Sequence, residues 1–148
     1  MGGSLKMLQG LLWFICTFHI IVGAGINFSP GITKAMANFY GAQVDWTPQF
    51  VYILKPLGAF MVVLGLLAVS AARDPLGNPA IVKGFIALFV IRAVQRPLFG
   101  REIYEAFGIP PARNLTNMAL FLALAACLVV LFRSAQKVKR LTEASGSK

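Results

Sequence analysis

The sequence predicts an all-α integral membrane protein, a four-helix bundle with a short amphipathic surface helix between the first two spans. Two observations predict this fold class. Of the 148 residues, 57% are hydrophobic and only 13% are charged, whereas charged residues make up about 25% of a typical soluble domain. The apolar residues also gather into four blocks, each close to the ~20 residues that a helix needs to cross a ~30 Å hydrocarbon core. Four spans leave almost no chain for a separate soluble domain.

The first predicted span covers residues 5–26. Lys6, the apolar stretch after it and the small residues 22–25 are similar to a secretory signal with its cleavage site. The apolar stretch is longer than a usual signal core, however, and its leading region carries one lysine. We therefore expect a retained helix. Cys16 in this span and Cys127 in the fourth lack a metal-ligand spacing and are expected to be small buried hydrophobes.

A short helix is predicted within residues 27–46, between the first and second spans. Ser29 followed by Pro30 is typical of a helix start, and Gly41 is typical of a helix end. Its apolar stripe consists of residues at i, i+4, i+7 and i+8, namely Ile32, Met36, Phe39 and Tyr40. Such a helix would lie flat on the outer surface of the bundle. It would be either a packed connector that covers the helix ends or a lid over a ligand.

The second predicted span covers residues 48–72. Thr47 can cap its first turn, and Pro48 suits the first helical position because its missing N–H would be unpaired there anyway. Gly58 and Gly65 are small residues that would let a neighbouring helix approach closely. This span should therefore pack through its glycine face.

The third predicted span covers residues 79–99 and forms an antiparallel hairpin with the second. Asn78 can cap it, and Pro79 takes its first position. Pro97 would kink this helix near the interface. The helix-compatible sequence beyond it would end at Gly108.

The fourth predicted span covers residues 115–132, with Asn114 as its cap after two helix-stopping prolines. Its packing is expected to use three small residues, Ala119, Ala123 and Ala126. Residues 1–135 would form the four-span domain. Residues 136–148 would follow as a basic tail in the cytoplasm.

The formal charge of +9 has to be divided between the two sides of the membrane. With the N-terminus inside, eight of the fourteen cations fall in cytoplasmic parts, namely Lys6, Arg73, Lys83, Arg133, Lys137, Lys139, Arg140 and Lys148. Of the other six, Lys55, Arg92 and Arg96 lie inside helices, which leaves three in translocated segments, Lys34, Arg101 and Arg113. We therefore expect both termini in the cytoplasm.

Arg92 and Arg96 lie one helical turn apart within the third span. A guanidinium in hydrocarbon costs at least roughly 2.5 to 3.5 kcal/mol, so both must face protein, water or a bound anion. With a rise of 1.5 Å per residue, Arg92 lies about 10 Å and Arg96 about 4 Å from the outer hydrocarbon edge. The same count places His19 and Lys55 about 10 Å from that edge. Three helices would thus bring these side chains, with Gln95 beside them, to one level.

Cations in this outer half exceed the available carboxylates. The acids on that side are Asp45, Glu102 and Glu105, and Glu105 is expected to pair with Arg101 at i, i+4. A buried excess of positive charge calls for an anion, which could be a lipid phosphate, a carboxylated substrate or an acidic side chain of a neighbouring subunit.

A plainer interpretation of the same residues stays open. Lys55 and Arg96 are shallow enough for their long side chains to reach the lipid headgroups. His19 would then be a hydrogen-bonded polar residue of the core. Arg92 fits this interpretation less well than Arg96, because it lies deeper along the same helix.

No enzyme or metal signature is present in the sequence. It has no paired carboxylates within a span, no histidine cluster, no Cys-x-x-Cys, no phosphate loop and no nucleophile elbow. No span contains an acid, which a proton-coupled transporter would be expected to need. We expect no catalytic residues, no metal and no required cofactor.

Three segments and the basic third span resemble the small four-helix bacterial membrane proteins of the DoxX-like and BphX-like type. The segments are INFSP at 26–30, KPLGAF at 55–60 and AARDP at 71–75. The resemblance covers roughly residues 5–132. It implies four spans in a bacterial inner membrane and supplies no catalytic residues.

Two functions remain as expectations. In the first, the protein is a non-catalytic accessory subunit of a larger membrane complex, respiratory or photosynthetic, with bound lipid, quinone or pigment. In the second, it works alone and binds or transports a small organic anion or lipid, with Arg92 and Arg96 as a clamp and residues 32–40 as a lid. A weaker third expectation is an oxidoreductase subunit with His19 as an axial ligand. The expected partners are membrane lipids and other membrane subunits, not nucleic acid.

Overall fold

A computed structural model describes residues 3–146, and within this range the regular structure consists of six helices and no strands. Their bounds are α1 (Gly3–Phe28), α2 (Pro30–Tyr40), α3 (Pro48–Arg73), α4 (Pro79–Leu98), α5 (Gly100–Phe107) and α6 (Pro111–Gly146). The predicted all-α fold class is therefore confirmed. Three segments are long and apolar enough to cross a membrane, Gly3–Phe28, Pro48–Arg73 and Pro111–Thr142. The 20-residue α4 carries Lys83, Arg92 and Arg96 and is not one of these three.

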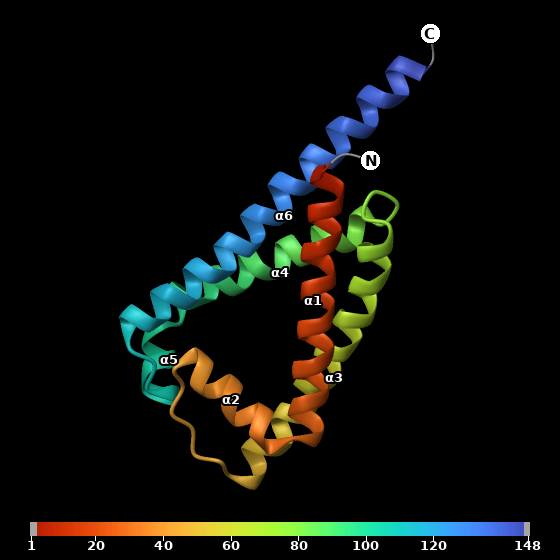
Figure 1. The fold of residues 1–148 in the computed structure, drawn as a ribbon. Coiled ribbons are helices and arrows are strands. Elements are labelled where there is room, and N and C mark those ends of the chain that lie inside the picture. Colours follow the sequence, from red (N-terminus) through yellow and green to blue (C-terminus); the bar gives the residue numbers. More distant parts are fainter. Residues whose placement is uncertain (1–2, 147–148) are drawn as a thin grey trace.

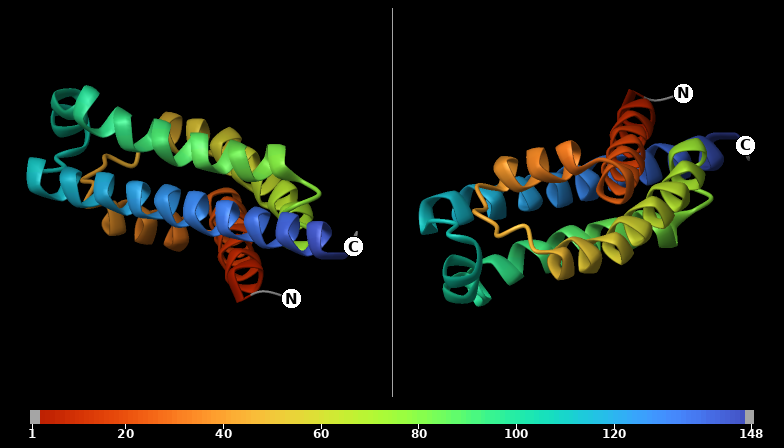
Figure 2. Two further views of the ribbon diagram at one scale, coloured as in Figure 1. Left: turned by 90° about the horizontal axis from the view of Figure 1, so that it is seen from above. Right: turned by 90° about the horizontal axis from the view of Figure 1, so that it is seen from below.

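The long helices form two side-by-side pairs. α1 packs along α3, and α4 packs along α6 (Figures 1 and 2). The two pairs meet near the turn at residues 74–78, which joins α3 to α4, and they diverge toward α2 and α5 (Figure 1). We call the region around the turn the packed end, and the region of α2, residues 41–47 and α5 the splayed end.

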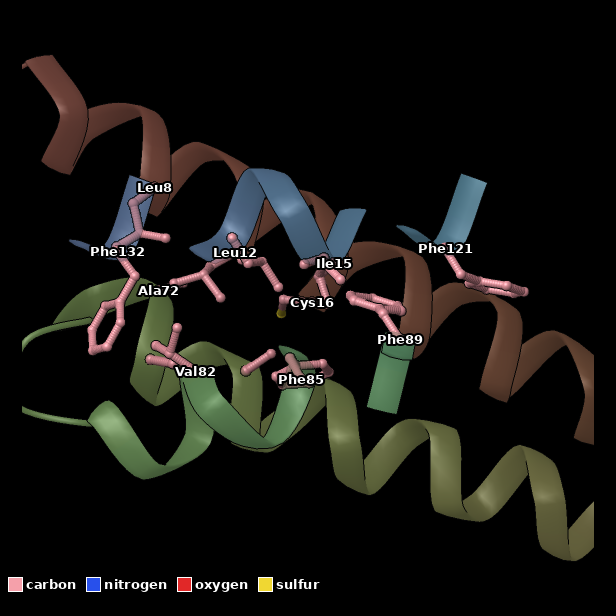
Figure 3. Packing of buried hydrophobic residues seen from close by; sticks show 14 of the residues in the cluster. Leu8, Leu12, Ile15, Cys16, Ala72, Val82, Phe85, Phe89, Phe121 and Phe132 are labelled. Atoms are coloured by element: carbon pink, nitrogen blue, oxygen red, sulfur yellow. The ribbon is translucent and has the colours of Figure 1, made fainter. Parts of the chain in front are cut away.

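Buried apolar side chains are concentrated toward the packed end (Figure 3). Leu8 and Leu12 of α1 and Leu128 of α6 have no exposed surface. α3 contributes small side chains to the same cluster, while α4 and α6 contribute large ones, including Val82, Phe85, Phe89, Phe121 and Phe132. In lipid, helices associate through this kind of close van der Waals packing rather than through removal of apolar surface from water.

The contact between α1 and α3 depends on glycine. A Cβ atom placed at Gly23 would lie 2.6 Å from the Gly58 carbonyl oxygen and 2.8 Å from the Val62 amide nitrogen. A Cβ atom at Gly65 would lie 2.6 Å from the Ile20 side chain. The prediction that Gly58 and Gly65 allow a close helix approach is thus confirmed, with Gly23 as the partner glycine on α1.

The predicted packing face of the fourth span is wrong. Ala119, Ala123 and Ala126 are exposed, and so is Cys127. The buried face of α6 instead follows residues three or four apart, namely Phe121, Ala125, Leu128, Phe132 and Ala135. Small size alone could not identify this face, because a one-residue rotation turns a helix position by about 100°. Cys16 is buried, as expected.

The helix that contains the predicted fourth span is longer than that span. α6 begins at Pro111 rather than at residue 115, because proline is tolerated in the first helical turn. Asn114 therefore lies inside the helix and does not cap it. Residues 136–146, predicted as a tail, continue α6, and the last two residues of that segment lie outside the described range.

Other predicted helix starts and ends agree with the structure. The Thr47 hydroxyl accepts a hydrogen bond from the Phe50 amide at 3.2 Å, and Ser29 plays the same role for Ile32 at 3.4 Å. Gly41 and Gly108 end α2 and α5 with φ of 77° and 63°, a left-handed conformation that suits glycine.

The α3–α4 turn and the end of α4 differ from their predictions. Asn78 stands at the cap position of α4, but its side-chain amide donates to the Asp74 carbonyl at 3.0 Å, so it closes the end of α3 instead. Pro97 lies in the last turn of α4, and the chain breaks at Phe99 before α5 rather than continuing as one kinked helix.

Candidate functional site

A cavity of about 570 Å³ lies at the splayed end, lined by α1 to α5, the loop at residues 41–47 and Ile109. Most of its lining is apolar or aromatic, including Phe18 of α1, Met36 of α2, and Leu57 and Met61 of α3. Its volume falls within the roughly 300–1,000 Å³ of small-molecule sites, which are typically apolar with a few convergent polar groups. This cavity is the candidate functional site.

The polar part of the cavity wall comes mainly from one face of α4. Arg92, Gln95 and Arg96 all line it. Their spacing of i, i+3 and i+4 places the three side chains on the same side of the helix. The structure therefore brings together three of the five residues that the sequence predicted for anion or partner contact.

Arg96 is held in place by contacts from α2 and α6. Its guanidinium carbon lies 5.4 Å from the centre of the Tyr40 ring and 5.9 Å from that of Phe121. Its Nη1 donates to the Asn114 side-chain oxygen at 3.3 Å, and Asn114 Nδ2 donates back to the Arg96 carbonyl at 2.7 Å. Stacking on aromatic faces and a hydrogen bond to a buried amide fix the orientation of this cation.

Arg92 is positioned by a single aromatic platform. Its guanidinium carbon lies 4.6 Å from the centre of the Phe121 ring, within the range of a cation–π contact. Among the described residues, no carboxylate lies within 4.0 Å of the Arg92 or Arg96 guanidinium. Glu105 is instead paired with Arg101 at 2.7 Å on the exposed surface of α5, as the sequence predicted. The two arginines thus bring positive charge to an apolar cavity without a carboxylate partner.

His19 and Lys55 lie apart from the cavity lining. His19 is 4% exposed, its Nδ1 lies 2.8 Å from the Ile15 carbonyl oxygen, and its ring meets those of Phe18 and Phe85 edge-on. Lys55 is exposed on α3. The side chains that were predicted to lie at one depth therefore have different surroundings. The two arginines and Gln95 line the cavity, His19 is packed in the interior, and Lys55 lies on the outer surface.

The helix α2 covers the cavity and is bonded at both ends. At its start, the Ser29 amide donates to the Gly25 carbonyl at 2.7 Å. At its end, Asn117 of α6 donates to the Tyr40 carbonyl at 3.0 Å, and Arg113 donates to the Phe39 carbonyl. Within the predicted stripe, Met36 and Tyr40 line the cavity, Ile32 packs against Gly25, and Phe39 is half exposed.

Sequence reasoning missed three residues of α6 that organise the site, Asn114, Asn117 and Phe121. The two asparagines are buried, at 7% and 3% exposure. A usable signal was present, because polar side chains three residues apart in an apolar helix usually bond to a neighbouring helix. Phe121 gave no such signal, since its ring contacts the arginines only because α6 lies beside α4.

The side chains that line the cavity are suited to binding a ligand. Within residues 3–146, no group of three or more His, Cys, Asp or Glu side chains could hold a metal ion. Two guanidinium groups and an amide facing an apolar space suit a ligand with an anionic head and a hydrocarbon body. Comparisons with protein-family models, curated proteins and solved structures found no match to this chain.

Proposed function

We propose that this chain is a four-span membrane protein that binds an amphipathic organic anion, with the anionic head on Arg92 and Arg96. One observation carries the proposal. Two guanidinium groups without a carboxylate partner line a largely apolar cavity of about 570 Å³. Charge-assisted hydrogen bonds from arginine to an oxyanion are strong, and low dielectric strengthens them further.

The fourth span of this proposal is α4. Its 20 residues would be about 30 Å long, the thickness of a hydrocarbon core. It lies along α6, and Arg92 and Arg96 face the cavity rather than the outer surface. Charged residues in membrane helices almost always face the protein interior in this way. We place the protein in a bacterial inner membrane with both termini in the cytoplasm and the splayed end outside.

Cysteine labelling of intact cells tests whether α4 crosses the membrane. Cys16 and Cys127 are replaced by alanine, and single cysteines are introduced as Arg73→Cys at the packed end or Tyr104→Cys at the splayed end, both at exposed sites. A membrane-impermeant maleimide should label Tyr104→Cys but not Arg73→Cys. Equal labelling of both would contradict a spanning α4, and the reverse pattern would contradict the orientation.

Binding of dodecanoate tests the proposed site. The protein is placed in nanodiscs of zwitterionic lipid, and affinity is measured by calorimetry, with dodecyltrimethylammonium as a probe of the same chain length and opposite charge. Arg92→Leu and Arg96→Leu should each weaken dodecanoate binding at least about tenfold, because each removes charge-assisted hydrogen bonds of about 1.5–3 kcal/mol. Lys55→Leu, which removes an exposed cation outside the cavity, is the matched control and should bind as wild type does.

The outcomes separate the two expected functions. Unchanged dodecanoate affinity in both arginine variants would refute the proposed site. If wild type binds neither probe and migrates on a blue-native gel only within a larger assembly, the accessory-subunit function takes its place.

A further inference from the structure

A second cavity of about 350 Å³ lies between α3 and α4. The first cavity reaches Met61 on α3 and Arg92 on α4, and the second includes Leu64 on α3 and Leu88 and Ile91 on α4. These positions are at most about one helical turn apart along the same two helices. Every side chain of the second cavity is apolar. We call it the α3–α4 groove.

The groove exists because α3 and α4 pack on different partners. The two helices are joined by the short turn at residues 74–78, yet α3 lies along α1 and α4 lies along α6. Small residues widen the gap, since a Cβ atom placed at Gly84 would have nothing within 4 Å. Leu67 and Ile91 on its walls are 47% and 54% exposed, so the groove opens onto the surface that a bilayer would cover.

The helix α2 and the loop after it, which line the first cavity, are held by hydrogen bonds to other helices. α2 is bonded to α1 at its start and to α6 at its end, through Ser29 and Asn117. The loop after it is bonded to α5 by the Gln43 amide, which donates to the Phe107 carbonyl at 2.7 Å. The α3–α4 groove has an open side that a bilayer would cover.

We infer that the ligand is a single-chain lipid carboxylate whose head lies on Arg92 and Arg96 and whose alkyl chain lies along the α3–α4 groove. The inference rests on the proposed anion site and adds the class and placement of its ligand. From Arg92 to Ile81, at the far end of the groove, α4 rises about 16 Å, which is close to half of a ~30 Å hydrocarbon core and hence to the length of one lipid chain. A volume near the lower limit of ligand sites suits one chain rather than two. The planar carboxylate matches the fork of a guanidinium.

Chain length and a groove-filling substitution test this placement. Octanoate should occupy only the first cavity, whereas hexadecanoate should also fill the groove and bind wild type at least about tenfold more tightly. Gly84→Phe should remove this advantage and leave octanoate affinity unchanged. Gly10→Phe is the matched control, because a Cβ atom there also has nothing within 4 Å and the residue lines neither cavity.

A measurement on the wild-type chain keeps the inference testable if Gly84→Phe does not fold. Hexadecanoate with a photoactivatable diazirine at its methyl end should crosslink to groove residues such as Leu67 and Leu88. Crosslinks to Met36 of α2 instead would overturn the placement, as would equal affinities for both chain lengths. In either case octanoate binding that depends on Arg92 would leave the proposed function standing. Absence of binding by both carboxylates would overturn the proposed function and this inference together.

Discussion

Gly23→Leu is expected to separate α1 from α3 and to cause the largest loss of stability of any single substitution considered for this protein. The new Cβ atom would lie 2.6 Å from the Gly58 carbonyl oxygen and 2.8 Å from the Val62 amide nitrogen. Both are backbone atoms, so no side chain can rotate away, and the helices themselves must move apart. Overpacking typically costs 1–3 kcal/mol, and a clash with backbone should cost about 3 kcal/mol.

The measurement is thermal unfolding in mild detergent, followed by circular dichroism and by the monodisperse fraction after heating. Gly10→Leu is the control on the same helix, where a Cβ atom meets nothing within 4 Å. Both substitutions gain about the same helix propensity, up to ~1 kcal/mol, so their difference isolates the contact with α3. Equal unfolding temperatures for the two variants would show that the glycine contact does not hold the helices together.

Asn114→Leu is expected to loosen α4 from α6 at the splayed end and to lower the free energy of unfolding by about 1–3 kcal/mol. The substitution removes the amide that accepts from the Arg96 guanidinium and donates to the Arg96 carbonyl. Asn114 is 7% exposed, so these groups lose partners in a site with little solvent. Dodecanoate affinity should fall as well, because Arg96 would lose the hydrogen bond that orients it.

Asn38→Leu serves as the control for this second effect. Asn38 is exposed on α2, and its replacement removes an amide of the same size from a surface site. Thermal unfolding and dodecanoate titration are measured on both variants. If Asn114→Leu matches Asn38→Leu in both measurements, the amide neither stabilises the α4–α6 contact nor orients Arg96.

The starts and ends of several helices were predicted well because the interactions that determine them are local. Thr47 with Pro48, Ser29 with Pro30, and the left-handed Gly41 and Gly108 act through hydrogen bonds and backbone geometry within a few residues. The glycines of α3 were also readable, since few other reasons place Gly58 and Gly65 in an apolar helix.

Depth along the membrane could be calculated from the sequence, but the direction of each side chain around its helix could not. His19, Lys55 and Arg92 were predicted at about the same depth, because each residue adds a 1.5 Å rise. In the structure, His19 is buried in the interior, Lys55 is exposed on the outside, and Arg92 lines the cavity. These directions depend on which helices are neighbours, a property of the whole fold.

Helix pairing also explains why the support of the arginines was missed. The ring of Phe121 and the amide of Asn114 reach α4 only because α6 packs along it. Nothing within either helix specifies that pairing. Two of the three charged residues of α4, Arg92 and Arg96, are the ones that line the cavity in this pairing.

The convergence of the helices at one end and their divergence at the other implies that resistance to local unfolding varies along the molecule. At the packed end, residues such as Leu8, Leu12 and Leu128 are fully enclosed, so opening there requires cooperative unfolding of several helices. At the splayed end, fewer buried contacts oppose the opening of α2 and α5, neither of which has a fully buried residue. A ligand in the cavity would stabilise mainly this second region. Ligand binding should therefore slow amide hydrogen exchange in α2 and α5 and leave the exchange of residues 8–12 unchanged.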